Sequence, residues 1–225
     1  IEQKKAVDAI MIPLMGRNYA SFLLHGVTGS GKTEIYIHLV KEVEKLGRTA
    51  IILLPEISLT PQISGRFGSI FGDKVAIWHS RMTFAERSWV WQEICKGKYS
   101  VLVGTRSAIF TPMQNVGLIV VDEEQESSYK QENPAPRYHA RDVAIMRGKL
   151  SKAVTLLGGA TPSMESYYNQ AVGKLDYLQL SSRFGNAVYP QVHVVDMKQE
   201  QDVRDDYSVI FSQLLCEKIA DRLEK

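Results

Sequence analysis

Short, nearly continuous runs of apolar residues recur along the chain, separated by segments in which apolar residues return at helical spacing. A strand that is covered on both faces of a sheet gives a run of this kind, because both sets of alternating side chains are buried. The runs predict strands at Ser21–His25, Thr49–Leu54, Lys74–His79, Ser100–Gly104, Gly117–Val121 and Ala153–Leu157.

The segments between these runs predict amphipathic helices at Ile35–Leu46, Pro61–Phe71 and Phe84–Lys96. Strands that alternate with helices are typical of a parallel central sheet with helices on both faces, so we expect an α/β fold.

The last part of the chain differs in pattern. Two strand-like runs, Tyr177–Leu180 and Val192–Val195, flank a turn-rich segment, and a final helix is predicted over Val209–Lys225. We therefore predict one domain over residues 1–180, followed by a connector toward a second domain over residues 181–225. The chain begins at Ile1 without a methionine and stops inside a charged helical pattern, so we expect a piece of a longer protein.

Composition narrows the class of protein without selecting one. With 44% hydrophobic and 23% charged residues, and no apolar run long enough to cross a bilayer, the sequence indicates a globular protein without a membrane partner. The net charge of +2 permits nucleic-acid binding but does not indicate it. Cys95 and Cys216 are too few for a disulfide framework or a cysteine-based zinc site, which favours the cytoplasm.

The strongest motif is a complete Walker A phosphate-binding loop, GVTGSGKT, between a predicted strand and a predicted helix. Its three glycines are expected to take φ > 0, so that backbone N–H groups turn toward a phosphate at the positive end of the helix. Lys32 supplies a charge to the β- and γ-phosphates, and Thr33 Oγ is placed to coordinate Mg²⁺. The predicted ATP-binding residues are Gly26, Thr28, Gly29, Ser30, Gly31, Lys32 and Thr33.

Adjacent acids end another predicted strand, in the sequence VGLIVVDEE from Val116 to Glu124. The pattern is typical of a Walker B element, in which Asp122 holds Mg²⁺ and Glu123 orients and deprotonates the attacking water. Together with Lys32, these two acids form the predicted catalytic set for ATP hydrolysis. A solvated acidic turn is the alternative for an isolated DEE sequence.

Six longer segments occur in a fixed order: LLPEISLTPQ, WHS, GTRSAIF, DEEQESSYKQ, PRYHARD and GGATPSMES. Together they closely resemble the first helicase lobe of the PriA family, the bacterial primosomal DNA helicases of superfamily 2 that act in replication restart. The resemblance implies a RecA-like P-loop NTPase that uses ATP and Mg²⁺ for 3′-to-5′ movement on single-stranded or forked DNA. It also implies primosome and single-strand-binding proteins as partners, a place at the bacterial nucleoid, and zinc only in a module absent from this chain.

Candidate DNA contacts lie at strand ends and helix starts. Thr60 caps a predicted helix that begins with a proline, and the free N–H groups of such a helix can bind a phosphate. Thr105 and Arg106 follow a predicted strand at the edge where open α/β sheets bind ligands. An ordinary helix cap and a surface ion pair of Arg106 are the structural alternatives.

The proline-containing segment Tyr129–Arg141 cannot form a regular helix throughout. It interleaves aromatic and basic residues, and Tyr129, Arg137 and Tyr138 suit base stacking and phosphate binding. In the family this loop links DNA binding to hydrolysis. The alternative is that the two tyrosines only fix the loop to the domain.

Three coupling positions and an adenine contact follow from the resemblance alone. Ala160 and Thr161 resemble the Ser-Ala-Thr motif that couples two helicase lobes, although a glycine replaces the serine. Gln125 stands where the family has histidine after DEE, and it lacks the protonation chemistry of the imidazole. Gln3 resembles the glutamine that reads adenine near the start of such lobes.

No segment after Thr161 resembles the arginine motif with which a second lobe closes the ATP site in superfamily 2. Because an arginine finger contributes roughly 10³ to 10⁵ in rate, we predict an ATP-dependent DNA helicase lobe with negligible turnover by itself. Two other functions stay open: a nucleotide-controlled protein-interaction switch and an RNA-directed helicase.

Overall fold

The computed structural model describes residues 2–56, 61–183, 191–204 and 207–224 of the chain. These residues divide into two compact units, residues 1–186 and residues 187–225. The division lies six residues after the boundary predicted between residues 180 and 181. The assignment of residues 181–225 as the start of a second lobe stays a prediction.

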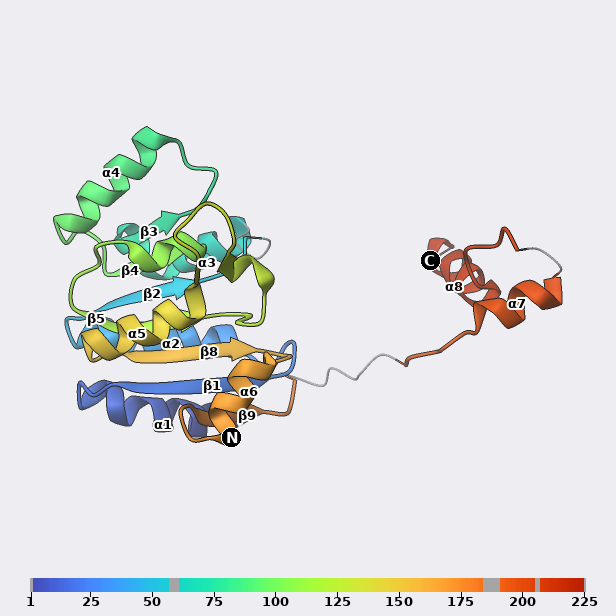
Figure 1. The fold of residues 1–225 in the computed structure, drawn as a ribbon, viewed down its shortest axis with the longest axis horizontal. Coiled ribbons are helices and arrows are strands. Elements are labelled where there is room, and N and C mark those ends of the chain that lie inside the picture. The colour runs from blue at the N-terminus through green and yellow to red at the C-terminus, as the bar shows by residue number, and fades with distance from the viewer. Residues whose placement is uncertain (1, 57–60, 184–190, 205–206, 225) are drawn as a thin grey trace. The chain divides into compact units, whose positions relative to one another are not determined.

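Seven parallel strands form one sheet in the first unit, in the order β3-β4-β2-β5-β8-β1-β9 (Figure 1). The predicted parallel α/β architecture is confirmed, and each of the first six predicted strands is present. The strands are β1 Ala20–Gly26, β2 Thr49–Leu53, β3 Val75–Trp78, β4 Val101–Gly104, β5 Val116–Val121, β8 Val154–Gly159 and β9 Asp176–Leu180.

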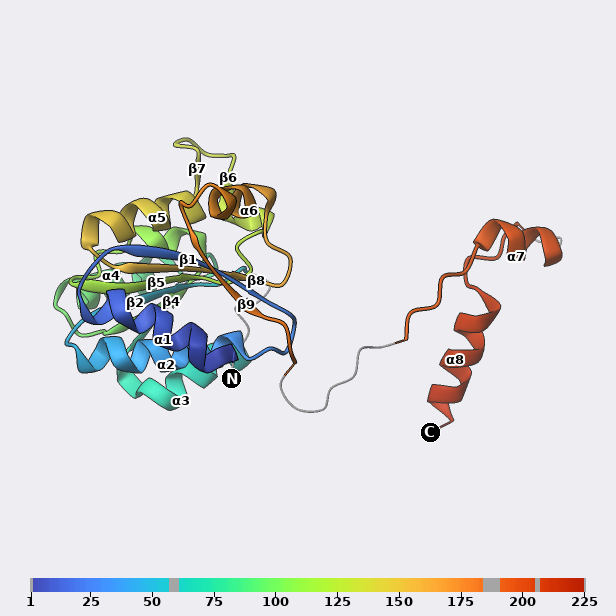
Figure 2. The ribbon, with the colours of Figure 1, turned by 90° about the horizontal axis from the view of Figure 1, so that it is seen from below.

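Helices cover both faces of this sheet (Figure 2). One face carries α1 Glu2–Met15, α2 Lys32–Lys45 and α3 Pro61–Phe71, and the other carries α4 Phe84–Cys95, α5 Ala140–Ser151 and α6 Met164–Ala171. Buried side chains form one hydrophobic core on each face of the sheet. Side chains of β1 alternate between these two cores: Phe22 and Leu24 pack toward α1, α2 and α3, and Leu23 packs toward α4 and α5. Both cores depend on strands that are buried on each side, which explains the continuous apolar runs.

The sequence pattern missed some helices and misplaced others. Helices α1, α5 and α6 of the first unit had no sequence prediction, and α1 contains Pro13. In the second unit, Val192–Val195 forms no strand, and α7 Met197–Arg204 follows it instead. The last helix, α8 Gln213–Leu223, begins later than predicted because Ser212 caps it by accepting a hydrogen bond from the backbone N–H of Leu215.

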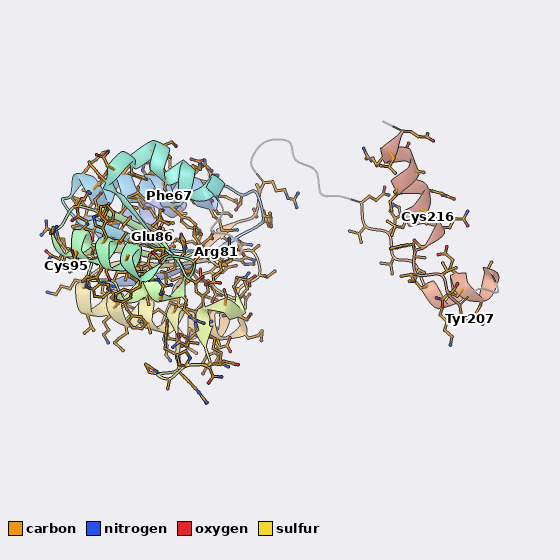
Figure 3. The ribbon with its side chains drawn as sticks, turned by 90° about the horizontal axis from the view of Figure 1, so that it is seen from above. Phe67, Arg81, Glu86, Cys95, Tyr207 and Cys216 are labelled. Carbon is orange, nitrogen blue, oxygen red and sulfur yellow. The ribbon has the colours of Figure 1, made fainter. Side chains whose placement is uncertain are left out.

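Two further observations concern the cysteines and the helices. Cys95 in α4 and Cys216 in α8 are both free and exposed (Figure 3). Among the helices in the described part of the chain, none is long and apolar enough to cross a membrane.

Candidate functional site

Three neighbouring strands bring the candidate motifs to one edge of the sheet. The Walker A loop follows β1, the acids Asp122 and Glu123 follow β5, and β8 lies between these two strands. Ligands of open parallel sheets bind beyond the carboxyl ends of the strands. A cavity of about 450 Å³ lies there, lined by Thr28, Gly29, Ser30, Gly31, Lys32, Thr33, Glu34, Arg66, Asp122 and Glu123. The predicted catalytic and metal-binding residues thus share one cavity.

The glycines of the Walker A loop serve two different purposes. Gly29 and Gly31 have φ of 77° and 88°, the left-handed region that favours glycine, and Gly31 is the N-cap of α2. The prediction of φ > 0 at Gly26 is wrong. A Cβ atom on Gly26 would lie 2.7 Å from Ser30 Oγ and 3.1 Å from Lys32 Cγ, so this glycine is required by the close return of the loop.

The donor groups of this loop fit a chain of phosphates. Lys32 Nζ donates to the carbonyl oxygen of Gly26 over 2.8 Å and lies 3.7 Å from Glu123 Oε1, so its charge is held inside the cavity. The buried hydroxyl of Ser30 has no hydrogen-bond partner among the described residues. With the N-terminus of α2, these groups form an anion site. Mg²⁺ also fits, because it binds through one or two carboxylates plus phosphates and needs no dedicated cage.

Asp122 is held by two buried tyrosines. Tyr36 of α2 donates its hydroxyl hydrogen to Asp122 Oδ1 over 2.8 Å, and Tyr129 donates to the Asp122 carbonyl oxygen over 2.7 Å. Burial raises the pKa of Asp122 to about 6, against the opposing effects of the Tyr36 hydrogen bond and the Lys32 charge. Burial, together with the charge of Asp122, raises the pKa of Tyr36 well above its ordinary range. Asp122 therefore has a fixed carboxylate that faces the cavity.

Glu123 has an unusual backbone. Its φ is 46°, a left-handed value that few residues other than glycine adopt. The turn is held by a bond from the backbone N–H of Glu126 to the Glu123 carbonyl oxygen, and Gln125 Nε2 donates to Glu123 Oε2 over 2.9 Å. Strained backbone that is retained by its surroundings is common at active sites. Here it directs the Glu123 carboxylate toward Lys32.

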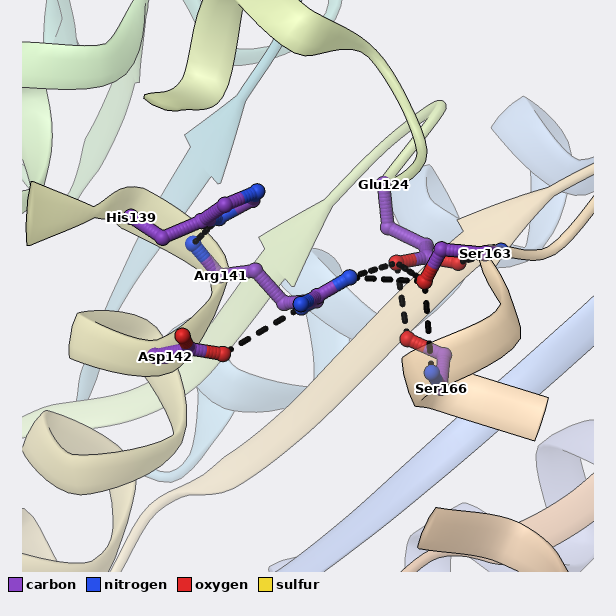
Figure 4. Close-up of polar contacts among 6 residues, drawn as sticks. All are labelled: Glu124, His139, Arg141, Asp142, Ser163 and Ser166. Atoms are coloured by element: carbon purple, nitrogen blue, oxygen red, sulfur yellow. Dashed lines mark hydrogen bonds and ion pairs between the residues drawn. The ribbon is translucent and has the colours of Figure 1, made fainter. Parts of the chain in front are cut away.

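Glu124 lies at the centre of a buried polar cluster (Figure 4). Its fully buried carboxylate accepts hydrogen bonds from Arg141 Nη1, from the backbone N–H and hydroxyl of Ser163, and from the Ser166 hydroxyl, over 2.7 to 3.1 Å. Burial of the Arg141 guanidinium is outweighed by its bonds to Glu124 and Asp142, so the pKa of Arg141 is raised. The cluster joins the acids after β5 to the starts of α5 and α6.

A short hairpin stands beside this cluster. Its strands, β6 Lys130–Gln131 and β7 Tyr138–His139, follow the short helix η3 Ser127–Tyr129 and precede α5. Gln131 Nε2 donates to the carbonyl oxygens of Pro134 and Pro136 and so holds the tip. A cavity of about 860 Å³ lies between the hairpin and α6, lined by Gln125, Lys130, Gln131, Glu132, Asn133, Arg137, Tyr138, His139, Arg141, Asp142, Ser163 and Glu165.

The aromatic surface at the hairpin is made by the half-buried Tyr138 and the exposed Phe110. Phe110 ends the short helix η2 Arg106–Phe110, is 50% exposed, and packs edge-to-face on Tyr138 with ring centroids 4.9 Å apart. The Arg106 guanidinium lies 5.9 Å from the Tyr138 ring centroid and donates to the carbonyl oxygens of Ser128 and Lys130. Arg106 therefore supports the hairpin and forms one side of an aromatic and cationic surface.

Two predicted DNA contacts are corrected by burial. Tyr129 is 0% exposed and bonded to the Asp122 backbone, and Thr105 is 3% exposed. Neither side chain can contact a DNA strand as it lies, so the structural alternative holds for Tyr129. Arg137 is exposed and Tyr138 half-buried at the hairpin. Thr60 lies outside the described residues.

The family model that matches this chain is that of the DEAD/DEAH box helicases, over residues 2–169. The chain belongs to the DEAD/DEAH box helicase family. Within it, the chain is 44% identical over 223 residues to replication restart protein PriA of Chlamydia pneumoniae, covering 99% of this chain and 30% of that protein. It is 45% identical over 224 residues to PriA of Bacillus subtilis strain 168, covering 100% of this chain and 28% of that protein. The predicted resemblance to the PriA family is confirmed.

Solved structures support the fold of this helicase domain. RecG bound to a three-way DNA junction superposes with a TM-score of 0.66 at 21% identity, over 91% of this chain and 26% of that chain. The Hef helicase domain of Pyrococcus furiosus gives a TM-score of 0.52 at 20% identity, over 76% of this chain and 36% of that chain. The fold is thus RecA-like. The chain spans about 30% of the length of the PriA proteins named above.

Of the coupling residues predicted for this helicase domain, Gln125 contacts the catalytic acid Glu123. A Cβ atom on Gly159 would lie 2.6 Å from Gln125 Oε1, so the two departures from the family pattern contact each other. The carbonyl oxygen of Ala160 lies 3.1 Å from His25 Nε2, at the end of β1, whereas Thr161 is exposed. Gln3 Nε2 donates to the Ser30 carbonyl oxygen, which places Gln3 on the Walker A loop.

Sequence reasoning missed several residues of this site. Glu124, Arg141 and Ser163 belong to the motifs quoted above, but only their proximity in the folded structure reveals that they form a cluster. Phe110 ends the GTRSAIF segment, where an apolar residue gave no sign of exposure. Tyr36 looks like a core residue of an amphipathic helix, and no sequence signal marks its hydroxyl.

Asp122→Asn is expected to stabilise the fold at neutral pH while removing a predicted Mg²⁺ ligand. Because the pKa of Asp122 is about 6 in the fold against an ordinary 3.8, the folded state binds this proton more tightly than the unfolded chain. The stability that the proton on Asp122 contributes is present in full below the unfolded pKa of 3.8 and is lost as pH rises through about 6. The difference between a pKa of about 6 in the fold and 3.8 in the unfolded chain corresponds to roughly 3 kcal/mol of stability at most.

Urea unfolding of both proteins at pH 5 and pH 8 measures this effect. The variant should gain more stability over the wild type at pH 8 than at pH 5. An equal difference at the two pH values would show that the Asp122 carboxyl is not held at a raised pKa.

Proposed function

We propose that this chain is the ATP-binding lobe of a 3′-to-5′ DNA helicase of superfamily 2 that acts in replication restart, and that it works with a second lobe. The observation that carries the proposal is the meeting of the Walker A loop, the Walker B acids and the GGATPS segment at the ends of β1, β5 and β8. The identity of 40 to 45% to PriA proteins over almost the whole chain supports the choice of nucleic acid and process.

Each residue of the ATP site has a role in this proposal. Lys32 leaves the Gly26 carbonyl oxygen and Glu123 to bind the β- and γ-phosphates, and Thr33 and Asp122 hold Mg²⁺. When bound, Mg²⁺ supplies positive charge that neutralises the phosphates. Glu123 orients a water molecule and accepts its proton. Lys32 stabilises the charge that develops on the transferred phosphoryl group.

We propose that the adenine base lies beside Gln3. A cavity of about 560 Å³ adjoins the Walker A helix and is lined by Gln3, Lys4, Val7, Asp8, Glu34, Ile35, Ile37, His38 and Lys41. The amide of Gln3 has both a donor and an acceptor, and its donor already contacts the Ser30 carbonyl oxygen. This position would let one side chain sense both the base and the phosphate loop.

DNA contacts are assigned to the aromatic and cationic surface at the hairpin. Tyr138 and Phe110 offer ring faces for base stacking, and Arg106 and Arg137 offer charges to the phosphates. Such contacts tolerate any base sequence, as a motor requires. In this proposal, a change on DNA binding at this surface reaches the turn that holds Glu123 through the Glu124 cluster. Gln125, Ala160 and Thr161 then couple that turn to a second lobe.

We propose that the chain alone hydrolyses ATP negligibly. Arg66 lines the phosphate cavity, but it is ion-paired with Glu34. Arginines of a second lobe would therefore have to supply the missing charge, and in related systems such a residue contributes roughly 10³ to 10⁵ in rate. The proposal also places the protein in the bacterial cytoplasm at the nucleoid, with primosome and single-strand-binding partners, and zinc in a module outside this chain.

ATP hydrolysis by the full-length protein, measured without nucleic acid, with single-stranded DNA and with RNA, tests the proposed function. Stimulation by DNA but not by RNA is expected. Equal or greater stimulation by RNA would favour an RNA-directed helicase. No stimulation by either would favour a nucleotide-controlled protein-interaction switch and contradict the motor.

Tyr138→Ala is expected to lower DNA-stimulated ATP hydrolysis about tenfold or more, because base stacking on an aromatic side chain contributes about 1–3 kcal/mol. ATP hydrolysis without DNA should stay unchanged. Leu150→Ala is the control, since Leu150 is 79% exposed at the other end of α5. An equal loss of basal and stimulated activity would contradict a role of Tyr138 in coupling.

A further inference from the structure

Tyr36 is a buried residue whose hydroxyl contacts Asp122, one of the residues that line the phosphate cavity. It lies in α2, four positions after Lys32, and is 1% exposed. A buried tyrosine hydroxyl needs a hydrogen-bond partner, and here the partner is Asp122 Oδ1 at 2.8 Å. The helix that starts at the phosphate loop is thus bonded directly to the carboxylate proposed to hold Mg²⁺.

The third strand of the site is shaped to admit this bond. A Cβ atom on Gly158 of β8 would lie 1.9 Å from Tyr36 Oη and 3.5 Å from Asp122 Oδ1. Any side chain at this position would displace the phenol. Because β8 lies between β1 and β5, the missing side chain leaves space for the hydrogen bond from α2 to Asp122.

The hydrogen bond also fixes how Asp122 presents its oxygens. With Oδ1 bonded to Tyr36, the carboxylate cannot rotate freely, and its remaining lone pairs keep one direction. Tyr36 and Thr33 are three positions apart on α2 and therefore lie on neighbouring parts of the same face. One helix thus carries a proposed Mg²⁺ ligand and the donor that orients the other ligand.

We propose that Tyr36 is a positioning residue for the Mg²⁺ site, acting through Asp122 and made possible by Gly158. The proposal rests on the proposed ATP-binding function. Partners that orient metal ligands typically change metal affinity by 10- to 100-fold when they are removed. Loss of the hydroxyl should therefore weaken Mg²⁺ binding at this site, so that nucleotide binding needs more Mg²⁺, and leave Mg²⁺-independent nucleotide binding unchanged.

Binding of a fluorescent ATP analogue to the chain, titrated with Mg²⁺ and repeated in EDTA, tests the proposal. Tyr36→Phe should raise the Mg²⁺ concentration for half-maximal binding about tenfold and leave the affinity in EDTA unchanged. Tyr168→Phe is the matched control, because Tyr168 is 65% exposed on α6, and it should behave like the wild type. Thermal unfolding of each variant checks that it is folded.

The outcomes separate this inference from the proposed function. If the wild type binds the analogue with a Mg²⁺ requirement that Tyr36→Phe shares, the positioning role is wrong. If Tyr36→Phe lost the same affinity for the analogue in Mg²⁺ and in EDTA, the positioning role would also be wrong, since equal losses indicate a general packing defect. If the wild type does not bind the analogue at all, the proposed ATP site itself is wrong.

Gly158→Ala gives a second route to the same conclusion. It keeps the Tyr36 hydroxyl but forces it away from Asp122, so the Mg²⁺ requirement should rise as in Tyr36→Phe. In the Tyr36→Phe background the added methyl should shift the Mg²⁺ requirement little further, because the bond is already lost. Independent, additive shifts from the two changes would contradict a shared hydrogen bond.

Discussion

Glu123→Gln should lower DNA-stimulated ATP hydrolysis by the full-length protein about 10²- to 10⁴-fold, the usual contribution of a general base. The reason is geometric as well as chemical, because the left-handed turn at Glu123 directs its carboxylate toward Lys32, with Oε1 3.7 Å from Nζ. An amide keeps the size of the side chain but cannot accept the proton of the attacking water. Nucleotide affinity should change little, since the phosphate loop is intact.

Steady-state ATP hydrolysis and equilibrium nucleotide binding measure the two halves of this prediction. Glu132→Gln is the control, because it makes the same chemical change on a 73% exposed side chain of the hairpin. Hydrolysis that survives Glu123→Gln within tenfold would assign the catalytic base to another residue.

Glu124→Gln should lower the free energy of unfolding of the domain by about 3 kcal/mol or more. Glu124 is 0% exposed and pairs with Arg141, whose side chain is 8% exposed. Breaking a buried ion pair by removing one partner costs about 3–5 kcal/mol, because the other charge stays buried without compensation. An amide also brings two hydrogens into a cluster that already contains four donors directed at Glu124.

Asp142→Asn is the matched control for this change. Asp142 binds the same Arg141 side chain over 3.2 Å, but its own side chain is 66% exposed. Exposed ion pairs contribute about 0–1 kcal/mol, so this variant should be nearly as stable as the wild type. For a domain of this size, the Glu124→Gln loss corresponds to a fall in Tm of about 10 °C. Equal Tm values for the two variants would contradict the central place of Glu124.

The fold was predictable where one physical rule dominated. Strands covered on both faces are apolar almost throughout, and the runs at β1, β2 and β5 show this pattern. Helices were harder where capping and tertiary contacts decide the outcome. Helix α5 begins directly after a hairpin that contains Pro134 and Pro136, and the strand predicted at Val192–Val195 has no neighbouring strand to pair with in the described part of its unit.

The site was predictable as far as its motifs were local. The Walker A residues and the two Walker B acids could be assigned because their chemistry depends on spacing along the chain. Burial could not be assigned in this way. Tyr129 and Phe110 are both aromatic residues in quoted motifs, yet Tyr129 is buried beneath Asp122 whereas Phe110 is half exposed. Only the packing of the hairpin against η2 distinguishes their roles.

Unwinding of partial-duplex DNA by the full-length protein tests the central claim most directly. With ATP and Mg²⁺, the account predicts that a duplex with a 3′ single-stranded tail on the loading strand is separated, and that one with only a 5′ tail is not. Lys32→Ala should abolish this activity, because Lys32 is the charge held inside the phosphate cavity. Failure to separate either substrate with ATP, or unwinding that persists without ATP, would contradict an ATP-driven DNA motor.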